Sequence, residues 1–368
     1  MAAQTSTSPP PSAVGQVVEG SSIVPGEPRV GVDAVPAGPV EPPVLAHYYM
    51  WFTPNSWNRA KSDIPLAGRY SSDDSDIMRE QITQAKRSGI DGFIVSWKST
   101  EVLNARLATL VAAAAAEDFK LEITYQGLDF NRNTLPGPRI AADLQEFADL
   151  YGKNPVFDLF GKPFVVLTGT PAMTRDQVME ISAPVRDRLL VLASDKDVAS
   201  YESIADLVDG DLYYWSSVNP ETNTRYATKL SEFGASVRSH GGIWIAPVSP
   251  GFDARLVGGK TVVDRRGGQT FRDEWAGAVA SEPDAIGIIS WNEFSENTHI
   301  EPSQLYGSQS LDIVAGFTGA AGAGSDVDSS ASPGQGSGWS SVVALAGVTM
   351  LFLGCGWILI RRSRRARS

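Results

Sequence analysis

The feature that most constrains the fold is an alternation of short apolar runs with longer amphipathic stretches, repeated along most of the chain. The runs are rich in β-branched and aromatic residues, as buried strands are. Strands that alternate with helices pair in parallel, and eight such units predict a closed (β/α)8 TIM barrel, an α/β fold. The eight predicted strands are Val44–Trp51, Gly92–Trp97, Lys120–Gln126, Pro163–Thr168, Leu189–Ser194, Asp211–Ser216, Gly242–Val248 and Ala285–Trp291.

The stretches between the runs show helical periodicity. Ile77, Ile82 and Ala85 recur at helix-like spacings. An open doubly wound sheet is the alternative. Such a fold typically has a glycine-rich turn after its first strand, where this chain has Tyr48–Phe52. The predicted helices include Asp74–Ser88, Val102–Asp118, Ile140–Tyr151, Ser200–Leu207, Thr222–Ser239 and Thr270–Ser281.

Both ends of the chain differ in composition from the predicted barrel, which covers residues 43–315. Residues 1–42, rich in Pro, Ser, Gly, Val and Ala, are predicted to be disordered. Residues 316–338 form a predicted Gly/Ala/Ser-rich spacer. Residues 339–360 contain an uncharged apolar core and predict one transmembrane helix, and the five arginines within 361–368 predict a cytoplasmic tail.

That arrangement predicts a single-pass protein of the cell membrane, with the lipid bilayer as a partner and the barrel outside the cell. No signal peptide is visible at the start of the sequence, although a barrel outside the cell needs an export signal. We therefore expect the true start to lie upstream of Met1; an inverted topology is the alternative.

Composition excludes several classes of function. The net charge of -11 argues against a nucleic-acid partner. The one cysteine, Cys355, lies in the apolar C-terminal run and allows neither an internal disulfide nor a cysteine zinc site. Motifs of metalloproteases, esterases, P-loop enzymes and dinucleotide-binding proteins are missing. We expect neither a metal nor a cofactor.

Aromatic and polar residues gather where the predicted strands end, which is where barrel enzymes carry their functional residues. Aromatic rings stack on the apolar faces of sugars, so this pattern favours a carbohydrate site. Some of these aromatics could instead cap the barrel, and Asp253 and His299 could serve the loops alone. The predicted substrate-binding residues are Tyr48, Tyr49, Trp51, Trp97, Tyr125, Trp215, Phe252, Asp253, Trp291, Asn292 and His299.

Glu293 and Glu296 follow the last predicted strand directly and are the predicted catalytic pair. Cleavage of a glycosidic bond needs a proton for the leaving oxygen and help for the charge at the anomeric carbon, and two carboxyl groups supply both. Mutual repulsion can separate their pKa values, so that one holds a proton while the other is ionised.

The run Trp291–Ser303, W-N-E-F-S-E-N-T-H-I-E-P-S, resembles the signature of glycoside hydrolase family 99, the endo-α-mannosidases and endo-α-mannanases. The resemblance covers about residues 44–307. It implies a retaining hydrolase that cuts an α-linked glycan through a 1,2-anhydro sugar. By motif position it implies that Glu293 acts on the substrate 2-hydroxyl as base and then acid. It implies that Glu296 protonates the leaving oxygen and later activates water.

The chain departs from that family at some positions, with Phe252 where a tyrosine is common and Asn297 where glycine stands. Phe294 and Ser295 are similar instead to glycoside hydrolase family 71, the endo-α-1,3-glucanases. We expect α-mannan or a related α-glycan as the first candidate substrate and α-1,3-glucan as the second. The alternative from another class is a catalytically silent surface protein that binds carbohydrate.

Overall fold

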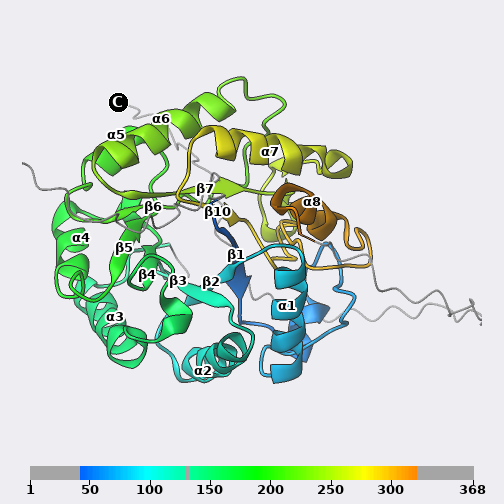
Figure 1. Ribbon diagram of the computed structural model, residues 1–368, viewed down its shortest axis with the longest axis horizontal. Helices are drawn as coiled ribbons and strands as arrows, with labels where there is room; N and C mark the ends of the chain where they lie inside the picture. The colour runs from blue at the N-terminus through cyan, green and yellow to red at the C-terminus, as the bar shows by residue number, and fades with distance from the viewer. Residues whose placement is uncertain (1–41, 130–131, 321–368) are drawn as a thin grey trace, which may run out of the picture. The chain divides into compact units, whose positions relative to one another are not determined.

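The chain folds into a closed barrel of eight parallel strands (Figure 1). The computed structural model describes residues 42–129 and 132–320. Around the barrel the strand order is β1-β10-β7-β6-β5-β4-β3-β2, so the first strand pairs with the last and confirms the predicted (β/α)8 fold. The barrel strands are β1 (Val44–Tyr49), β2 (Gly92–Trp97), β3 (Lys120–Tyr125), β4 (Phe164–Leu167), β5 (Leu190–Ala193), β6 (Gly210–Asp211), β7 (Ile243–Val248) and β10 (Ala285–Ile288).

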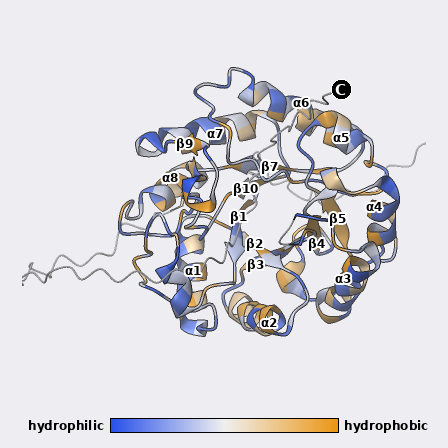
Figure 2. Cartoon of the chain, turned by 180° about the vertical axis from the view of Figure 1, so that it is seen from behind, coloured by the Kyte–Doolittle hydropathy of each residue, from blue (hydrophilic) through white to orange (hydrophobic). Residues whose placement is uncertain are grey.

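Helices surround the ring of strands and carry hydrophilic as well as hydrophobic residues (Figure 2). Side chains cap several of them at the start: the Asp74 carboxylate accepts hydrogen bonds from two backbone N–H groups of α1, and Thr100 accepts one from α2. The helices are α1 (Ser75–Arg87), α2 (Glu101–Ala116), α3 (Gly137–Tyr151), α4 (Arg175–Ser182), α5 (Val198–Glu202), α6 (Tyr226–Ser239), α7 (Gln269–Ala280) and α8 (Gln309–Thr318).

Short elements lie in the loops between them. The loop after β7 contains an antiparallel hairpin of β8 (Phe252–Asp253) and β9 (Val262–Val263). The 3-10 helices are η1 (Pro54–Asn58), η2 (Pro155–Phe157), η3 (Thr170–Ala172), η4 (Arg255–Val257) and η5 (Arg266–Gly268).

Two apolar layers hold the barrel together, because successive side chains of a strand point to opposite faces. The larger layer packs between the strands and the helices. The smaller one fills the barrel interior and closes it below the C-terminal ends of the strands. Its buried members are Leu45, Ile94, Phe164, Val166, Leu192, Leu212, Ile245 and Ala285.

The sixth strand is the element that differs most from its prediction. The predicted strand Asp211–Ser216 is wrong in its extent, because the ladder with β5 and β7 ends at Asp211. The aromatic residues Tyr213–Trp215 therefore lie beyond the ladder and form no strand: Tyr213 and Tyr214 line the barrel mouth, whereas Trp215 packs against the helices. Two helices, α4 and α8, were not predicted.

The last helix extends past residue 315, the predicted end of the barrel domain. Helix α8 continues to Thr318, and the ring of Phe317 stacks on Trp275 of α7 with the centroids 4.6 Å apart. The predicted segments 339–360 and 361–368 lie outside the described residues. Within 42–129 and 132–320, no helix has both the length and the apolar character needed to cross a bilayer.

The interior layer gives a test of the fold. Leu192 on β5 is fully buried inside the barrel. We expect Leu192→Ala to lower the free energy of unfolding by about 2–5 kcal/mol, because the lost methyl groups leave a cavity that the closed barrel cannot fill. Urea denaturation measures this loss. Leu150→Ala, at a position 63% exposed on α3, is the control and should cost less than about 0.5 kcal/mol. Equal losses would contradict the assigned interior.

Candidate active site

The alternation of side chains along each strand decides which residues reach the barrel mouth. On β1, Leu45 lies in the interior layer, so His47 and Tyr49 continue on the same inward face. Equivalent inward positions from the other strands join them around a cavity of about 40 Å³. The cavity is lined by His47, Tyr49, Ser96, Thr124, Gln126, Leu128, Arg132, Val166, Thr168, Gly169, Ser194, Leu212, Tyr213 and Tyr214.

Most residues that line this mouth cavity carry a neutral polar group, although the surface that they expose to it is mainly apolar. The Tyr49 hydroxyl donates to the Tyr214 hydroxyl at 2.8 Å, and Gln126 Nε2 donates to Ser96 Oγ at 2.6 Å. The His47 ring packs edge-on against Tyr214, and burial lowers the pKa of His47 to about 3, so this imidazole is neutral. Hydroxyl, amide and imidazole groups of this kind suit the hydroxyls of a sugar.

The two predicted catalytic glutamates lie in the loop that follows β10. This loop closes on itself, because the Ser290 N–H donates to the Thr298 carbonyl at 2.8 Å and the Ile300 N–H donates to the Ser290 carbonyl at 2.9 Å. Inside it, the Glu293 N–H donates to Ser290 Oγ at 2.8 Å. The closed loop thereby holds both glutamates at the C-terminal end of the barrel.

Burial and charge separate the behaviour of the two carboxyl groups. Burial, followed by the negative charge of Glu293, raises the pKa of Glu296 to about 8. Burial also raises the pKa of Glu293, but a hydrogen bond from the Ser295 N–H and the charge of Lys61 oppose that rise. Glu293 is therefore the member that ionises more readily, and Glu296 is the member that holds its proton near neutral pH.

Neither glutamate lines the mouth cavity, since Glu293 is 3% exposed and Glu296 is fully buried. Both carboxyl groups lie close enough to Tyr214 to interact with it electrostatically, and the positive charge of Arg132 opposes the rise in the pKa of Glu296. Tyr214 and Arg132 line the cavity, so the glutamates lie behind its wall. A cavity of this volume is far smaller than the sites that usually hold small-molecule ligands.

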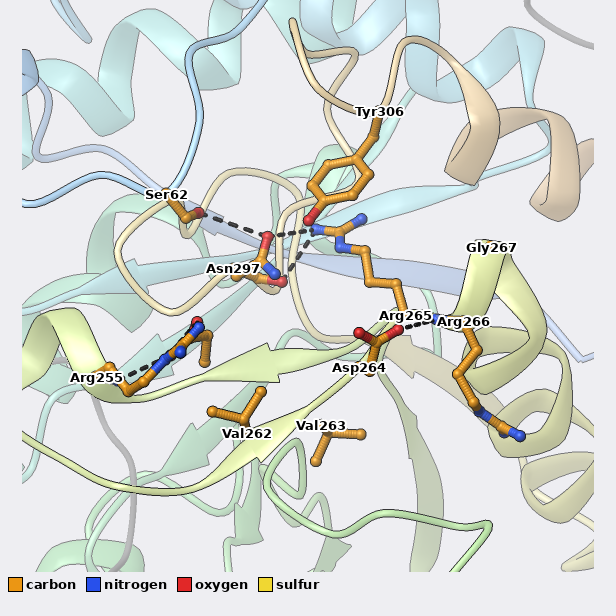
Figure 3. Close-up of a pocket in the computed structure, with 11 residues that line it drawn as sticks. Ser62, Arg255, Val262, Val263, Asp264, Arg265, Arg266, Gly267, Asn297 and Tyr306 are labelled. Atoms are coloured by element: carbon orange, nitrogen blue, oxygen red, sulfur yellow. Dashed lines mark hydrogen bonds and ion pairs between the residues drawn. The ribbon is translucent and has the colours of Figure 1, made fainter.

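A second, larger cavity of about 340 Å³ adjoins the same loop on another side (Figure 3). The Asp253 N–H donates to the Glu296 carbonyl at 2.7 Å and links the β8–β9 hairpin to the loop that carries both glutamates. Arg265 lies against the Tyr306 ring, 4.0 Å from its centroid, and donates to the Asn297 carbonyl. The lining residues are Ser62, Asp253, Arg255, Val262, Val263, Asp264, Arg265, Arg266, Gly267, Asn297 and Tyr306.

Five of the predicted substrate-binding aromatics lie elsewhere. They lie in or against the layer between strands and helices. Tyr48, Trp97 and Tyr125 face outward from their strands, whereas Trp215 and Trp291 follow the ends of β6 and β10. The prediction that they line the substrate site is therefore corrected for these five. Their partners in that layer are Gln81 for Tyr48, Asn104 for Trp97, Asp143 for Tyr125, Phe93 for Trp291 and Tyr226 for Trp215.

Two predicted residues do lie at the mouth. Tyr49 lines the cavity, and Trp51, 42% exposed, stacks on it with the ring centroids 4.3 Å apart. Asn292 is fully buried and braces the mouth, because its amide accepts from the Tyr49 N–H at 2.9 Å and donates to the Tyr49 carbonyl at 3.1 Å.

The other three predicted residues serve the surrounding loops. Asp253 lines the larger cavity but is ion-paired with Arg255 at 2.6 Å. Phe252 forms the small core of the hairpin with Val263. His299 is buried against Phe294, and burial lowers its pKa to about 4, so it is neutral.

Sequence reasoning missed the inward-facing polar residues of the mouth. Four of these residues lie directly beside an aromatic residue that the sequence predicted to bind substrate: His47, Ser96, Thr124 and Gln126. The available signal was the strand alternation: the polar members face inward and the aromatic members face the helices. Among the described residues no cluster of three His, Cys, Asp or Glu side chains could hold a metal ion.

Because the pKa of Glu296 is raised in the folded protein, ionisation of this carboxyl at higher pH lowers the free energy of unfolding. A carboxyl whose folded pKa of about 8 lies above its ordinary 4.5 favours folding at low pH, and this contribution disappears as the pH rises through 8. Neither oxygen of Glu296 has a hydrogen-bond partner within the described part of the chain. We expect Glu296→Gln to raise the free energy of unfolding by on the order of 2 kcal/mol near pH 8.

Denaturant melts across pH measure this effect. The gain should shrink toward zero as the pH falls to about 4.5. The exposed Glu80 of α1 gives the control Glu80→Gln, for which we expect no such trend. A Glu296→Gln gain that is constant with pH would contradict a buried, protonated carboxyl at this position.

Comparisons with known proteins identify the family and the fold of the chain. Residues 66–316 match the model of glycosyl hydrolase family 71. An endo-alpha-mannosidase of glycoside hydrolase family 99 from Bacteroides thetaiotaomicron is 19% identical, with a TM-score of 0.66 over 75% of this chain and 96% of that chain. A structure described as a glycoside hydrolase-like protein is 18% identical, with a TM-score of 0.58 over 75% of this chain and 93% of that chain.

At these identities the two structures show a shared barrel fold and no more. No curated protein matches the sequence. The family match spans well over half of the chain and includes the loop after β10 that carries Glu293 and Glu296. The chain therefore belongs to glycosyl hydrolase family 71 and is a glycoside hydrolase.

Proposed function

We propose that the protein hydrolyses an α-linked glycan, with Glu296 as the general acid and Glu293 as the base. The observation that carries this proposal is the asymmetry of the buried pair. Glu296 holds its proton up to about pH 8, while Lys61 and the Ser295 N–H favour the ionised form of Glu293. An acid and a base that coexist at one pH are what glycosidic cleavage requires.

The base acts in one of two ways, and the stereochemistry of the sugar decides which. In an α-mannoside the 2-hydroxyl is trans to the leaving oxygen. Glu293 can take the proton of that hydroxyl while its oxygen attacks the anomeric carbon and Glu296 protonates the departing oxygen. Water then opens the 1,2-anhydro sugar, loses its proton to Glu296, and the 2-oxygen regains its proton from Glu293. The product retains the anomeric configuration.

In an α-glucoside the 2-hydroxyl is cis to the leaving oxygen, so it cannot attack from the opposite face. Glu293 would then activate a water molecule, which displaces the leaving group in one step and inverts the anomeric carbon. Membership in family 71 supports α-1,3-glucan, the second candidate from the sequence. The run Thr298–Pro302, similar to family 99, supports α-mannan. The substrate and the stereochemical outcome are therefore linked.

Two features support action within a polymer. Trp51 presents an exposed ring beside the mouth, where a sugar ring can stack. The larger cavity next to Glu296 has the volume typical of ligand sites and polar walls that could hold a further sugar unit. A silent carbohydrate-binding protein would need the aromatic surface but not a buried acid and base.

Release of reducing ends from α-1,3-glucan and from α-mannan tests the activity, with a β-1,3-glucan as the third substrate. We expect Glu293→Gln and Glu296→Gln to lower kcat by about a hundredfold to ten-thousandfold, because each removes a proton-transfer group. Glu122→Gln is the matched control, since Glu122 is equally buried but accepts its hydrogen bond from the Phe164 N–H at the other end of the barrel. NMR of the first product gives the anomeric outcome.

Cleavage of the β-glucan alone would contradict an α-specific enzyme. Intact binding without cleavage, in the original protein and in the variants alike, would favour the carbohydrate-binding alternative.

The pH profile is a separate test. Glu296 must hold its proton to act as the acid, and its pKa is raised to about 8. We expect kcat/KM to fall tenfold per pH unit above about pH 8. A profile that falls already above the ordinary carboxyl pKa of 4.5 would show that Glu296 is not the acid.

A further inference from the structure

The loop between β1 and α1 brings a lysine to the catalytic loop. Lys61 Nζ donates to Ser295 Oγ at 3.0 Å, across more than two hundred positions of sequence. Ser295 stands between the two glutamates in the chain, and its backbone N–H donates to Glu293 Oε1 at 2.9 Å. The Ser295 side chain also hydrogen-bonds to Glu293. A continuous polar path therefore leads from the ammonium group to one carboxylate of the pair.

We propose that Lys61 and Ser295 are positioning residues that hold Glu293 in its ionised form and so decide which glutamate is the base. This inference rests on the proposed function, because it assigns the two roles within the same catalytic pair. The path ends on Glu293 and not on Glu296, whose carboxyl oxygens have no hydrogen-bond partner in the described part of the chain.

Lys61 is not required to attach its loop to the catalytic loop. Ser62 already does so, since its N–H and its hydroxyl both donate to the Phe294 carbonyl, at 2.9 and 2.7 Å. A cluster of buried aromatic residues that includes Phe52 and Phe294 packs the two loops together as well. These contacts set the position of Lys61, and removal of its charge leaves them in place.

The other charged groups near the pair act differently. Burial lowers the pKa of Lys61, the negative charge of Glu293 opposes that fall, and the positive charge of Arg59 adds to it. Arg132, from the loop after β3, lowers the pKa of Glu296 through its positive charge. The Tyr214 hydroxyl interacts electrostatically with both glutamates. The positive charge of Lys61 stabilises the ionised form of Glu293, and burial of the site keeps their interaction strong.

The consequence appears on the acidic side of the pH profile. Glu293 must lose its proton to act as base, so its pKa sets the acidic limb of kcat/KM. Without the ammonium charge the buried carboxylate is less stable, and the pKa of Glu293 rises further above its ordinary value. The limb should therefore move to higher pH while the basic limb, set by Glu296, does not rise.

The test compares the pH profiles of the full-length protein and its Lys61→Met, Lys61→Arg and Ser295→Ala variants. We expect Lys61→Met to move the midpoint of the acidic limb about one unit higher in pH. At pH values below that midpoint, kcat/KM should be about tenfold lower than in the original protein. Lys61→Arg should restore the original limb. Ser295→Ala keeps the backbone N–H and should give a smaller shift in the same direction. Lys153→Met, an exposed lysine between α3 and β4 at the opposite end of the barrel, is the control.

An acidic limb of Lys61→Met that coincides with the original one overturns the proposal. If Lys61→Met does not fold, Ser295→Ala decides in its place. A protein that cleaves no glycan would refute the proposed function separately. In that case carboxyl 13C NMR, with the Glu293 signal assigned through Glu293→Gln, follows the same titration without catalysis. A Glu293 pKa that is unchanged by Lys61→Met would then overturn the proposal.

Discussion

The pairing of the first strand with the last is the interaction on which the site depends. It closes the barrel through the β1–β10 ladder, and beyond the ladder the Trp291 N–H donates to the His47 carbonyl at 2.7 Å. Asn292 then bonds to both the N–H and the carbonyl of Tyr49, as a neighbouring strand would. Because of this closure, the glutamates after β10 lie beside the mouth residues of β1 and the loop that carries Lys61.

Burial supplies the chemistry of the pair. Ionisation of both members of a buried carboxyl pair is unfavourable, because each loses its hydration and the two negative charges repel. Small differences in their surroundings therefore decide which carboxyl keeps the proton. Here Lys61 and a hydrogen-bond donor stabilise the charge of Glu293. Glu296 has no donor from the described residues, and the charge of Arg132 only partly offsets burial and the negative charge of Glu293. The same burial that separates the two roles also places both side chains behind the wall of the mouth cavity.

The barrel could be predicted, and the acidic pair could be singled out as the catalytic candidate, because each depends on local pattern. Strand runs and amphipathic stretches are visible in short windows, and Glu293 and Glu296 follow an apolar run where charge is unusual. The short β6 could not be predicted in the same way, since Tyr213–Ser216 has the composition of a strand but lies beyond the ladder with β5 and β7. Several aromatic residues predicted to line the mouth face the helices instead, and the residue next to each one lines the mouth. Examples are Tyr48 beside His47 and Tyr125 beside Thr124.

The sequence by itself determined the number and type of the repeating units, the class of fold and the identity of the acidic pair, because these follow from periodicity and from residues adjacent in the chain. Only the tertiary structure decided which face of each strand looks into the mouth, since a shift of one residue exchanges the two faces. It also decided that Lys61 meets Ser295, because that contact depends on barrel closure and on two loops that the sequence holds far apart.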